Sequence, residues 1–217
     1  MASDDEPDLP AGDFTSWLAG MQAALAGEGE SDVPCGTCTA CCTSSQFVHV
    51  TPDETDTLAH IPRDLLFRAP GLPAGHLLMG YDERGHCPML RDGGCSIYEH
   101  RPRTCRTYDC RVFPAAGLDP GDGKPQIASR ARRWRFSHDD GGQVRHSAVR
   151  AAAAFLEHNG DRLPDPLVPS NPTRRAVLAV EVHETFLPPD GTDRVAGASS
   201  THDVIEEIVV RVRRRKA

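Results

Sequence analysis

The sequence predicts an α+β protein with a small, cysteine-rich core that is stabilised by metal and combines short antiparallel strands with flanking helices. All eight cysteines of the 217-residue chain fall between residues 35 and 110. Helical apolar periodicity and short strand-like runs are mixed along the chain, without a repeating βαβ pattern. The 19 glycines, 18 prolines and 39% hydrophobic content indicate many loops, and metal ligation can replace part of the missing apolar core.

The N-terminal region predicts an acidic arm followed by one helix. Residues 1–11 are acidic and contain proline, so we expect them to be disordered. Apolar side chains then recur at helical spacing over residues 13–26, and Gly27 and Gly29 end this amphipathic helix. The recurring residues are Phe14, Trp17, Leu18, Met21 and Leu25.

The segment that follows the first cysteines predicts strands and short helices. Residues 47–51 have strand character, and a helix begins at Thr51-Pro52 and ends near Pro62. Two apolar runs flank residues 82–85 and predict a hairpin of strands 76–81 and 86–90. A third short strand is expected at 95–98, after a turn at Gly93 and Gly94.

The remaining elements are mainly helical. A short helix over 99–109 carries Cys105, whereas the pattern over 127–136 leaves a strand and a basic helix equally open. Helices are also expected at 143–158 and at about 172–187, the latter capped by Asn171.

These elements suggest five segments in order. They are a disordered acidic arm (1–11), a cysteine-cluster metal-binding domain with its N-terminal helix (12–136), a helical extension packed on it (137–187), a linker (188–201) and a basic C-terminal helix (202–217).

The net charge of −7 comes from one end of the chain. Residues 1–34 carry eight acidic side chains and no Lys or Arg, which leaves 23 acidic and 24 basic side chains in the remainder. The start of the chain lacks the basic and apolar segments of a secretion signal, and no run is long enough to span a membrane. We therefore expect a cytoplasmic protein with reduced thiols and no membrane contact.

The cysteine spacing favours metal ligation over disulfides. Four thiols lie within residues 35–42, in the order C-x2-C-x2-C-C, and such crowding suits a shared ligand better than four distant pairings. Gly36 suits the tight turn that lets two sulfurs reach one metal. The predicted ligands are Cys35, Cys38, Cys41, Cys42, Cys87, Cys95, Cys105 and Cys110.

The spacing leaves the metal and the ligand pairing open. Adjacent side chains diverge, so Cys41 and Cys42 are not expected to bind one tetrahedral metal together. Eight thiols suffice for two four-thiolate sites. Zinc and a [4Fe–4S] cluster both take four thiolates, and C-x2-C-x2-C is also the leading spacing of bacterial ferredoxins, so we favour iron–sulfur over Zn²⁺.

The string from Cys35 to Cys42 resembles the CxxCxxCC signature of the YkgJ family. The run Cys87-Pro-Met-Leu90, the run Gly94-Cys95-Ser-Ile-Tyr98 and the segment from Arg101 to Cys110 are similar to the same family. The resemblance covers about 35–112 and implies a zinc- or iron-chelating domain. Some relatives are called iron–sulfur proteins, and flagellin lysine N-methylases carry a similar cluster.

Several residues beside the cysteines are candidates for supporting roles. Arg106 can neutralise the charge of a four-thiolate cofactor site, or it can pair with a nearby acid. His86 and His100 can replace a thiol ligand, although eight thiols make this unnecessary. The arginines around Trp134 can bind nucleic acid, but we favour a partly exposed face against the acidic arm.

The leading functional hypothesis is a cytoplasmic metal-binding protein with a redox or electron-transfer role, or an accessory of an enzyme, with an unidentified protein or small-molecule partner. One alternative is an enzyme that modifies a protein or small molecule, as the methylase resemblance implies, although no glycine-rich nucleotide loop is present. Another is a structural zinc module that binds a macromolecule.

Overall fold

The computed structural model describes residues 7–216 except 32, 122, 140, 166 and 189–199. Residues 1–6 of the expected arm therefore lie outside the described residues, and so does most of the expected linker (188–201). The described α-helices are α1 (Phe14–Ala26), α2 (Thr55–His60), α3 (Arg103–Thr107), α4 (Val112–Ala116), α5 (Pro125–Arg132), α6 (Gly142–Asn159), α7 (Pro172–Val182) and α8 (Thr201–Lys216). The described strands are β1 (Leu9–Asp13), β2 (Val48–Val50), β3 (Leu66–Arg68), β4 (Leu77–Met79), β5 (Leu90–Arg91), β6 (Gly94–Cys95) and β7 (Trp134–Ser137). This mixture confirms the predicted α+β class.

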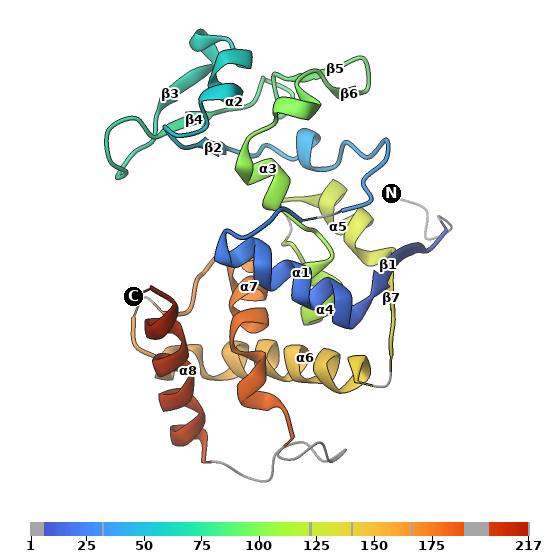
Figure 1. Ribbon diagram of the computed structural model, residues 1–217, viewed down its shortest axis with the longest axis vertical. Coiled ribbons are helices and arrows are strands. Elements are labelled where there is room, and N and C mark those ends of the chain that lie inside the picture. Colours follow the sequence, from blue (N-terminus) through green and yellow to red (C-terminus); the bar gives the residue numbers. More distant parts are fainter. Residues whose placement is uncertain are drawn as a thin grey trace.

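The elements form two halves that differ in their secondary structure (Figure 1). The first, which we call the helical half, contains α1, α4, α6, α7 and α8; α6 packs against α7, and α4 packs against both. The second, which we call the cysteine half, contains strands β2 to β6 with α2 and α3. None of the described helices is long and apolar enough to cross a membrane.

The helical half holds the larger apolar core. Among the described residues this core contains 24 buried side chains, and Phe14, Phe113, Ile127 and Ile208 are fully buried within it although they come from four helices. The predicted helix starts are confirmed at two caps. The Asp13 carboxylate accepts a hydrogen bond from the Ser16 amide at 2.9 Å, and the Asn171 side chain accepts one from the Arg174 amide at 3.1 Å.

A parallel pair of strands corrects one expectation from the sequence and resolves an alternative that the sequence leaves open. β1 pairs with β7, so the chain is ordered from Leu9 and the expected disorder is wrong for residues 9–11. The reason is pairing with a strand that is distant in the sequence, together with burial of Ala11. The open choice over 127–136 resolves into both forms, because α5 ends at Arg132 and β7 begins at Trp134.

The expected hairpin of strands 76–81 and 86–90 is wrong. β4 pairs antiparallel with β2 on one side and with β3 on the other, and β3 was not expected from the sequence. This pairing brings Val50 and Met79 into one buried cluster. Residues 82–85 still form a turn, since the Asp82 carboxylate accepts a 2.8 Å hydrogen bond from the His86 amide.

The true hairpin in this region is smaller and lies further along the chain. β5 pairs with β6, and the two residues between them, Asp92 and Gly93, have φ of 50° and 79°. Positive φ at both positions is typical of a tight two-residue hairpin turn, which Asp-Gly suits. The strand expected over 95–98 is therefore only Gly94–Cys95.

The helices of the cysteine half are shorter than expected. α2 begins at Thr55 rather than at Thr51-Pro52, because Glu54 folds back and accepts a 2.9 Å hydrogen bond from the Thr51 amide. α3 spans only Arg103–Thr107 within the expected 99–109, since Pro102 precedes it and the chain before it forms a 3₁₀ turn. Cys105 lies on α3 as predicted.

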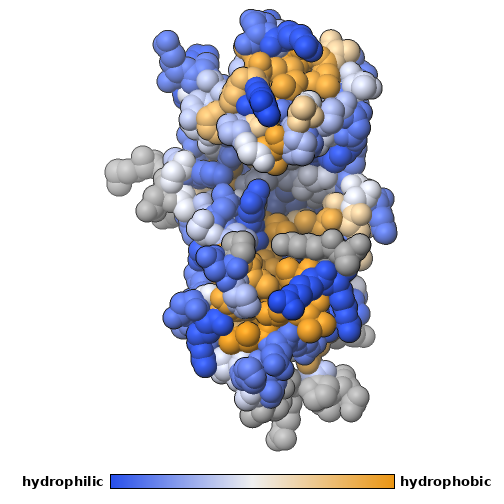
Figure 2. Space-filling model, turned by 90° about the vertical axis from the view of Figure 1, so that its left-hand side faces the viewer, coloured by the Kyte–Doolittle hydropathy of each residue, from blue (hydrophilic) through white to orange (hydrophobic). Residues whose placement is uncertain are grey.

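The apolar core of the cysteine half is small. Among the described residues its buried cluster comprises six side chains, and part of the apolar surface of this half stays exposed. Phe47 contacts both Phe67 and Tyr81, and these three rings are 56%, 44% and 42% exposed. Figure 2 shows apolar surface in both halves on the side of β3 and α8. Burial alone therefore provides much less stabilisation in the cysteine half.

Protonation of His146 makes the stability of the helical half depend on pH. Its ring stacks on Phe14 with centroids 4.2 Å apart, and its Nδ1 lies 2.8 Å from Nε2 of the exposed His138. Burial, followed by the positive charge of Arg150, lowers the pKa of His146 from 6.5 to about 4. The folded state therefore favours the neutral imidazole more than the unfolded state does. This contribution to the free energy of unfolding is complete above pH 6.5 and is lost as the pH falls towards 4.

We expect His146→Phe to weaken the acid sensitivity of the fold. The variant keeps an aromatic ring against Phe14 but removes the titrating group, so the stability difference between neutral pH and pH 4 should shrink by about 1–2 kcal/mol, with solvent screening included. Urea denaturation at several pH values measures this. The exposed His158 on the same helix supplies the control His158→Gln, and equal pH profiles for both variants would contradict the assignment.

Candidate metal centre

The eight predicted ligands come from separate turns, short helices and strands of the chain. Only Cys110 is buried, Cys41 and Cys105 are exposed residues, and the others are half-buried; all eight are free cysteines. Cys41 and Cys42 begin a 3₁₀ turn, whereas Cys95 lies on β6. The expected tight turn is present at the start of the string. Gly36 has φ of 55°, and the Cys38 amide donates to the Cys35 carbonyl at 2.9 Å.

One group of contacts connects the start of the string with Cys110. The Trp134 indole N–H donates to Cys110 Sγ at 3.2 Å. The Arg130 guanidinium stacks on the same indole at 4.8 Å, and its Nη2 donates to the Cys35 carbonyl at 3.4 Å. Arg130 and Trp134, from α5 and β7, therefore hold Cys35 and Cys110 on either side of one cation–π pair.

A second group of contacts connects Cys42 with the hairpin. The Cys87 amide donates to the Cys42 carbonyl at 2.7 Å. Cys95 pairs with Leu90 in the β5–β6 ladder, and the Leu90 amide donates to the Cys87 carbonyl at 2.9 Å. Cys87 and Cys95 also pack against the same small apolar cluster of the cysteine half.

Burial and neighbouring thiolates make the metal-free thiols weak acids. Burial, followed by the charges of Cys87 and then Cys95, raises the pKa of Cys42 to about 12. Burial also raises the pKa of Cys110 to about 12, against the opposing effect of the Trp134 hydrogen bond. A cation must displace these protons, so metal affinity should rise with pH.

The two exposed cysteines follow the same pattern. Although each residue is exposed as a whole, the surrounding chain desolvates its thiol. Desolvation raises the pKa of Cys41, and the next largest effects come from Cys110 and then Cys35. Desolvation raises the pKa of Cys105 to about 12, followed by the charges of Cys87 and Cys42.

The sulfurs are not packed as closely as one tetrahedral zinc requires. Because Zn–S bonds are about 2.3 Å long, two thiolates on one zinc lie about 4 Å apart. Among the described residues, which include all eight cysteines, no three cysteine sulfurs lie within 4.8 Å of one another. In a [4Fe–4S] cluster each thiolate binds a different iron, so its sulfurs lie farther apart.

One group of ligand-type side chains does meet the 4.8 Å spacing, and it contains no cysteine. It consists of Asp56, His60 and His100 on the surface of the cysteine half. The Asp56 carboxylate lies 2.8 Å from Nδ1 of His100, and the two imidazole rings stack with centroids 3.5 Å apart. Nδ1 of His60 contacts the Asp56 carbonyl at 2.9 Å. These contacts join α2 to the 3₁₀ turn at residues 98–100, and they place His100 in a hydrogen bond with Asp56.

Arg106 makes an ion pair with Glu30, with Nε 3.0 Å from the carboxylate. Its carbonyl also accepts a 3.0 Å hydrogen bond from the Ser31 amide. These contacts match the acid-pairing alternative for Arg106. Its role beside a cofactor stays a prediction.

Two other arginines act electrostatically on the thiols. Burial and then the Cys38 charge raise the pKa of Cys35, and Arg130 and Arg101 lower it. Arg101 also lowers the pKa of Cys105, although burial and the neighbouring thiolates prevail. In the sequence, Arg130 is only one residue of a basic stretch. No helical spacing predicts its contact with Trp134, because α5 ends at Arg132 and Trp134 begins β7.

The other arginines of the basic stretch contact acidic groups and backbone. Arg135 pairs with Asp8 at 3.0 Å, and Arg132 pairs with Asp119 at 3.3 Å. Nε of Arg133 donates to the Pro7 carbonyl at 2.9 Å. The stretch therefore lies against the start of the chain, as the favoured interpretation expected.

Asp109 lies directly before Cys110 and is almost fully buried. Its carboxylate accepts hydrogen bonds from the Trp17 indole at 2.9 Å and the Ser31 hydroxyl at 2.8 Å, and it pairs with Arg111 at 2.8 Å. Asp109 thus joins α1 and the loop before the cysteine string to the backbone beside Cys110. These contacts give it a structural role.

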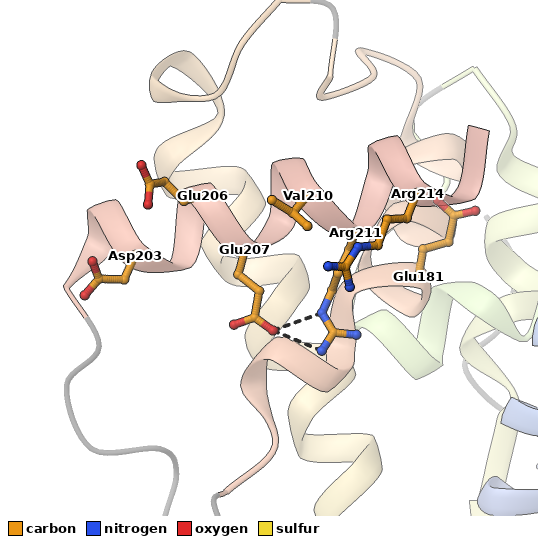
Figure 3. Close-up of a pocket in the computed structure, with 7 residues that line it drawn as sticks. All are labelled: Glu181, Asp203, Glu206, Glu207, Val210, Arg211 and Arg214. Carbon is orange, nitrogen blue, oxygen red and sulfur yellow. Dashed lines mark hydrogen bonds and ion pairs between the residues drawn. The ribbon is translucent and has the colours of Figure 1, made fainter. Parts of the chain in front are cut away.

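A hollow of about 700 Å³ lies at the surface of the helical half, on the side of α8. Figure 3 shows Glu181 of α7 facing side chains of α8, with Arg211 paired to Glu207. Arg211 also pairs with Glu184 at 2.6 Å. Acidic and basic groups thus alternate here. Part of the basic charge of α8 is neutralised by the ion pairs that Arg211 makes within the protein.

We expect Trp134→Phe to lower metal affinity about 10-fold, because a donor to a ligand sulfur stabilises the charged thiolate. Phenylalanine keeps the buried ring but cannot donate to Cys110. Competition with a chelator measures the affinity. Trp17→Phe is the matched control, since it removes an indole donor from a carboxylate instead of a sulfur. Equal losses in both variants would contradict a specific role for the N–H···S bond.

Taken together, eight free thiols from six turns and elements, with supporting arginine and indole donors, define a cysteine-ligated metal-binding protein. Residues 34–121 match the model of the CxxCxxCC family, described as "Putative zinc- or iron-chelating domain". The match spans all eight cysteines and confirms the predicted resemblance to a cysteine-cluster family over this part of the chain. No curated protein and no solved structure matches the chain.

Proposed function

We propose that this chain is an iron–sulfur protein that exchanges electrons with a redox partner, directly or as an accessory of an enzyme. The observation that carries the proposal is the spacing of the thiols. They gather in the cysteine half and beside it, yet no three sulfurs come within 4.8 Å among the described residues. That spacing suits a multi-iron cluster, whose ligands sit on different iron atoms, better than one zinc.

The charges around the thiols support the same proposal. Four thiolates and an iron–sulfur core together carry negative charge, and hydrogen-bond donors to the sulfurs adjust the reduction potential. Trp134 donates to Cys110, and Arg130 lies beside Cys35. Nε of Arg130 is buried and has no hydrogen-bond partner among the described residues. An anionic cofactor would satisfy this donor.

The exposure of the cysteines suits electron exchange. Cys41 and Cys105 are exposed as whole residues although their thiols are desolvated, so a cluster held by either would lie just beneath the surface. A partner could then approach it closely. The transfer moves one electron between the cluster and a redox protein and makes or breaks no covalent bond. Ligand thiols must stay reduced, which favours a cytoplasmic setting.

Anaerobic purification followed by metal and sulfide analysis tests the proposal. We expect a brown protein with iron and acid-labile sulfide in equal amounts, whose colour bleaches on addition of dithionite. A colourless protein that contains zinc and no sulfide would overturn the iron–sulfur assignment and favour the structural zinc module.

A further inference from the structure

We propose that the eight cysteines form two separate four-thiolate centres, one held by Cys35, Cys38, Cys41 and Cys110 and the other by Cys42, Cys87, Cys95 and Cys105. We call them centre 1 and centre 2. The inference rests on the proposed function and deepens it, because it assigns each ligand and fixes two cofactors per chain.

Centre 1 is supported by contacts that link the start of the cysteine string to Cys110. Cys35 and Cys38 share one tight turn, closed by the 2.9 Å hydrogen bond between them. The Arg130–Trp134 pair contacts both the Cys35 carbonyl and the Cys110 sulfur. Cys110 belongs to the core of the helical half, and Ala40 and Tyr108 pack against that same core. Centre 1 therefore lies where the string meets the helical half.

Centre 2 is supported by contacts within the cysteine half. Backbone hydrogen bonds connect Cys42 to Cys87, and the β5–β6 ladder then brings Cys95 beside the same turn. The apolar cluster of the cysteine half contacts both Cys87 and Cys95. α3, which carries Cys105, packs on β2 of this half, and the neighbouring Thr104 hydroxyl donates to the His49 carbonyl at 2.7 Å.

Two placements complete the assignment. Cys105 lies on α3, which packs on β2 of the cysteine half, so it joins centre 2. Cys41 directly follows Ala40, which packs against the core of the helical half, whereas the Cys42 carbonyl accepts a hydrogen bond from the Cys87 amide. The adjacent pair Cys41–Cys42 is therefore divided between the centres, as expected for neighbouring side chains that diverge.

This division gives the Cys-Cys pair a specific role. Successive Cα atoms lie about 3.8 Å apart, so a ligand of each centre sits on either side of a single peptide bond. The two centres are therefore close to each other. Their unpaired electrons should interact when both clusters are reduced, and this interaction can be detected by electron paramagnetic resonance.

The proposal is tested with serine variants of the full chain, purified anaerobically and analysed for iron and sulfide. Since each [4Fe–4S] cluster has four irons, the parent should contain about eight. Cys110→Ser and Cys87→Ser should each retain about half. The same-centre double variant Cys35→Ser/Cys110→Ser should lose no more iron than Cys110→Ser alone. The cross-centre variant Cys110→Ser/Cys87→Ser should lose all of it.

Spectroscopy supplies a readout that does not depend on metal yield. The dithionite-reduced parent should give a broadened, spin-coupled signal, and Cys110→Ser should give the simple signal of one isolated cluster. Thr37→Ser is the matched control, since it changes a hydroxyl residue within the string and should keep both the iron content and the coupled signal.

Three outcomes would overturn the pairing. They are a parent with only about four irons, loss of all iron in every single variant, and a same-centre double variant that loses more than either single one. Two zinc ions per chain, lost one by one along the same division, would support the pairing while overturning the iron–sulfur function. A chain that binds neither metal would overturn both.

Discussion

Metal removal is expected to unfold the cysteine half while leaving most of the helical half folded. The buried core of the cysteine half contains six side chains among the described residues, whereas that of the helical half contains 24. Six buried residues cannot offset the conformational entropy of about 60 ordered residues. Ligation by cysteines on distant turns must supply the difference, as in small metal-stabilised domains.

The expected effect is large. Structural metal sites contribute on the order of 10 kcal/mol to folding. A loss of about 5 kcal/mol would already lower the melting temperature of a chain of this size by roughly 10–20 °C. The far-ultraviolet circular dichroism should change little at 25 °C, because α1, α6, α7 and α8 contribute most of the helix and carry no cysteine.

Hydrogen exchange after chelation measures the effect residue by residue. Amides of β2 and β4 should lose protection, whereas those of α6 and α7 should keep it, and protection should return when the metal is added back. Loss of protection in both halves together would contradict independent unfolding. Unchanged protection in β2 would contradict metal as a folding element.

The helical half follows closely from the sequence. α1 and α7 carry local signals at their starts, since Asp13 and Asn171 cap them and apolar side chains repeat on one face. Such signals depend on residues within one or two turns of each other. These signals therefore predict the helices independently of the tertiary contacts made by the rest of the chain.

The strand pairing does not follow in the same way. The sequence around residues 82–85 favours a local hairpin, yet β4 pairs with β2 and β3. The choice depends on which register buries Met79 with Val50, and that is a property of the tertiary structure. β1 does not follow from the sequence either, because its partner β7 lies more than 120 residues away.

The candidate site shows the same contrast. The candidate ligands and the resemblance to the family follow from spacing, since thiols close in sequence share turns. The proposed division between Cys41 and Cys42 does not follow from it, because that division depends on where Cys87 and Cys110 arrive from distant segments. Trp134 as a donor to Cys110 likewise requires contact between residues 24 positions apart.

Asp109→Ala is expected to destabilise the metal-loaded protein by about 3–5 kcal/mol, because it would break the buried ion pair between Asp109 and Arg111. The exposed fractions are 3% for Asp109 and 7% for Arg111. The change also removes the acceptor for the Trp17 indole and the Ser31 hydroxyl. Urea denaturation at neutral pH measures the loss.

Two further variants separate the loss of the Asp109–Arg111 ion pair from the loss of the other contacts. Ser31→Ala removes one neutral donor and should cost only about 1 kcal/mol. The double variant Asp109→Ala/Arg111→Met removes both charges, so it should recover much of the stability that Asp109→Ala loses, even though the indole and hydroxyl remain without an acceptor. If the double variant is as unstable as the single one, the cost comes from the lost connection of α1 to the backbone beside Cys110. In that case metal loss should accompany unfolding, since the position of Cys110 depends on the same carboxylate.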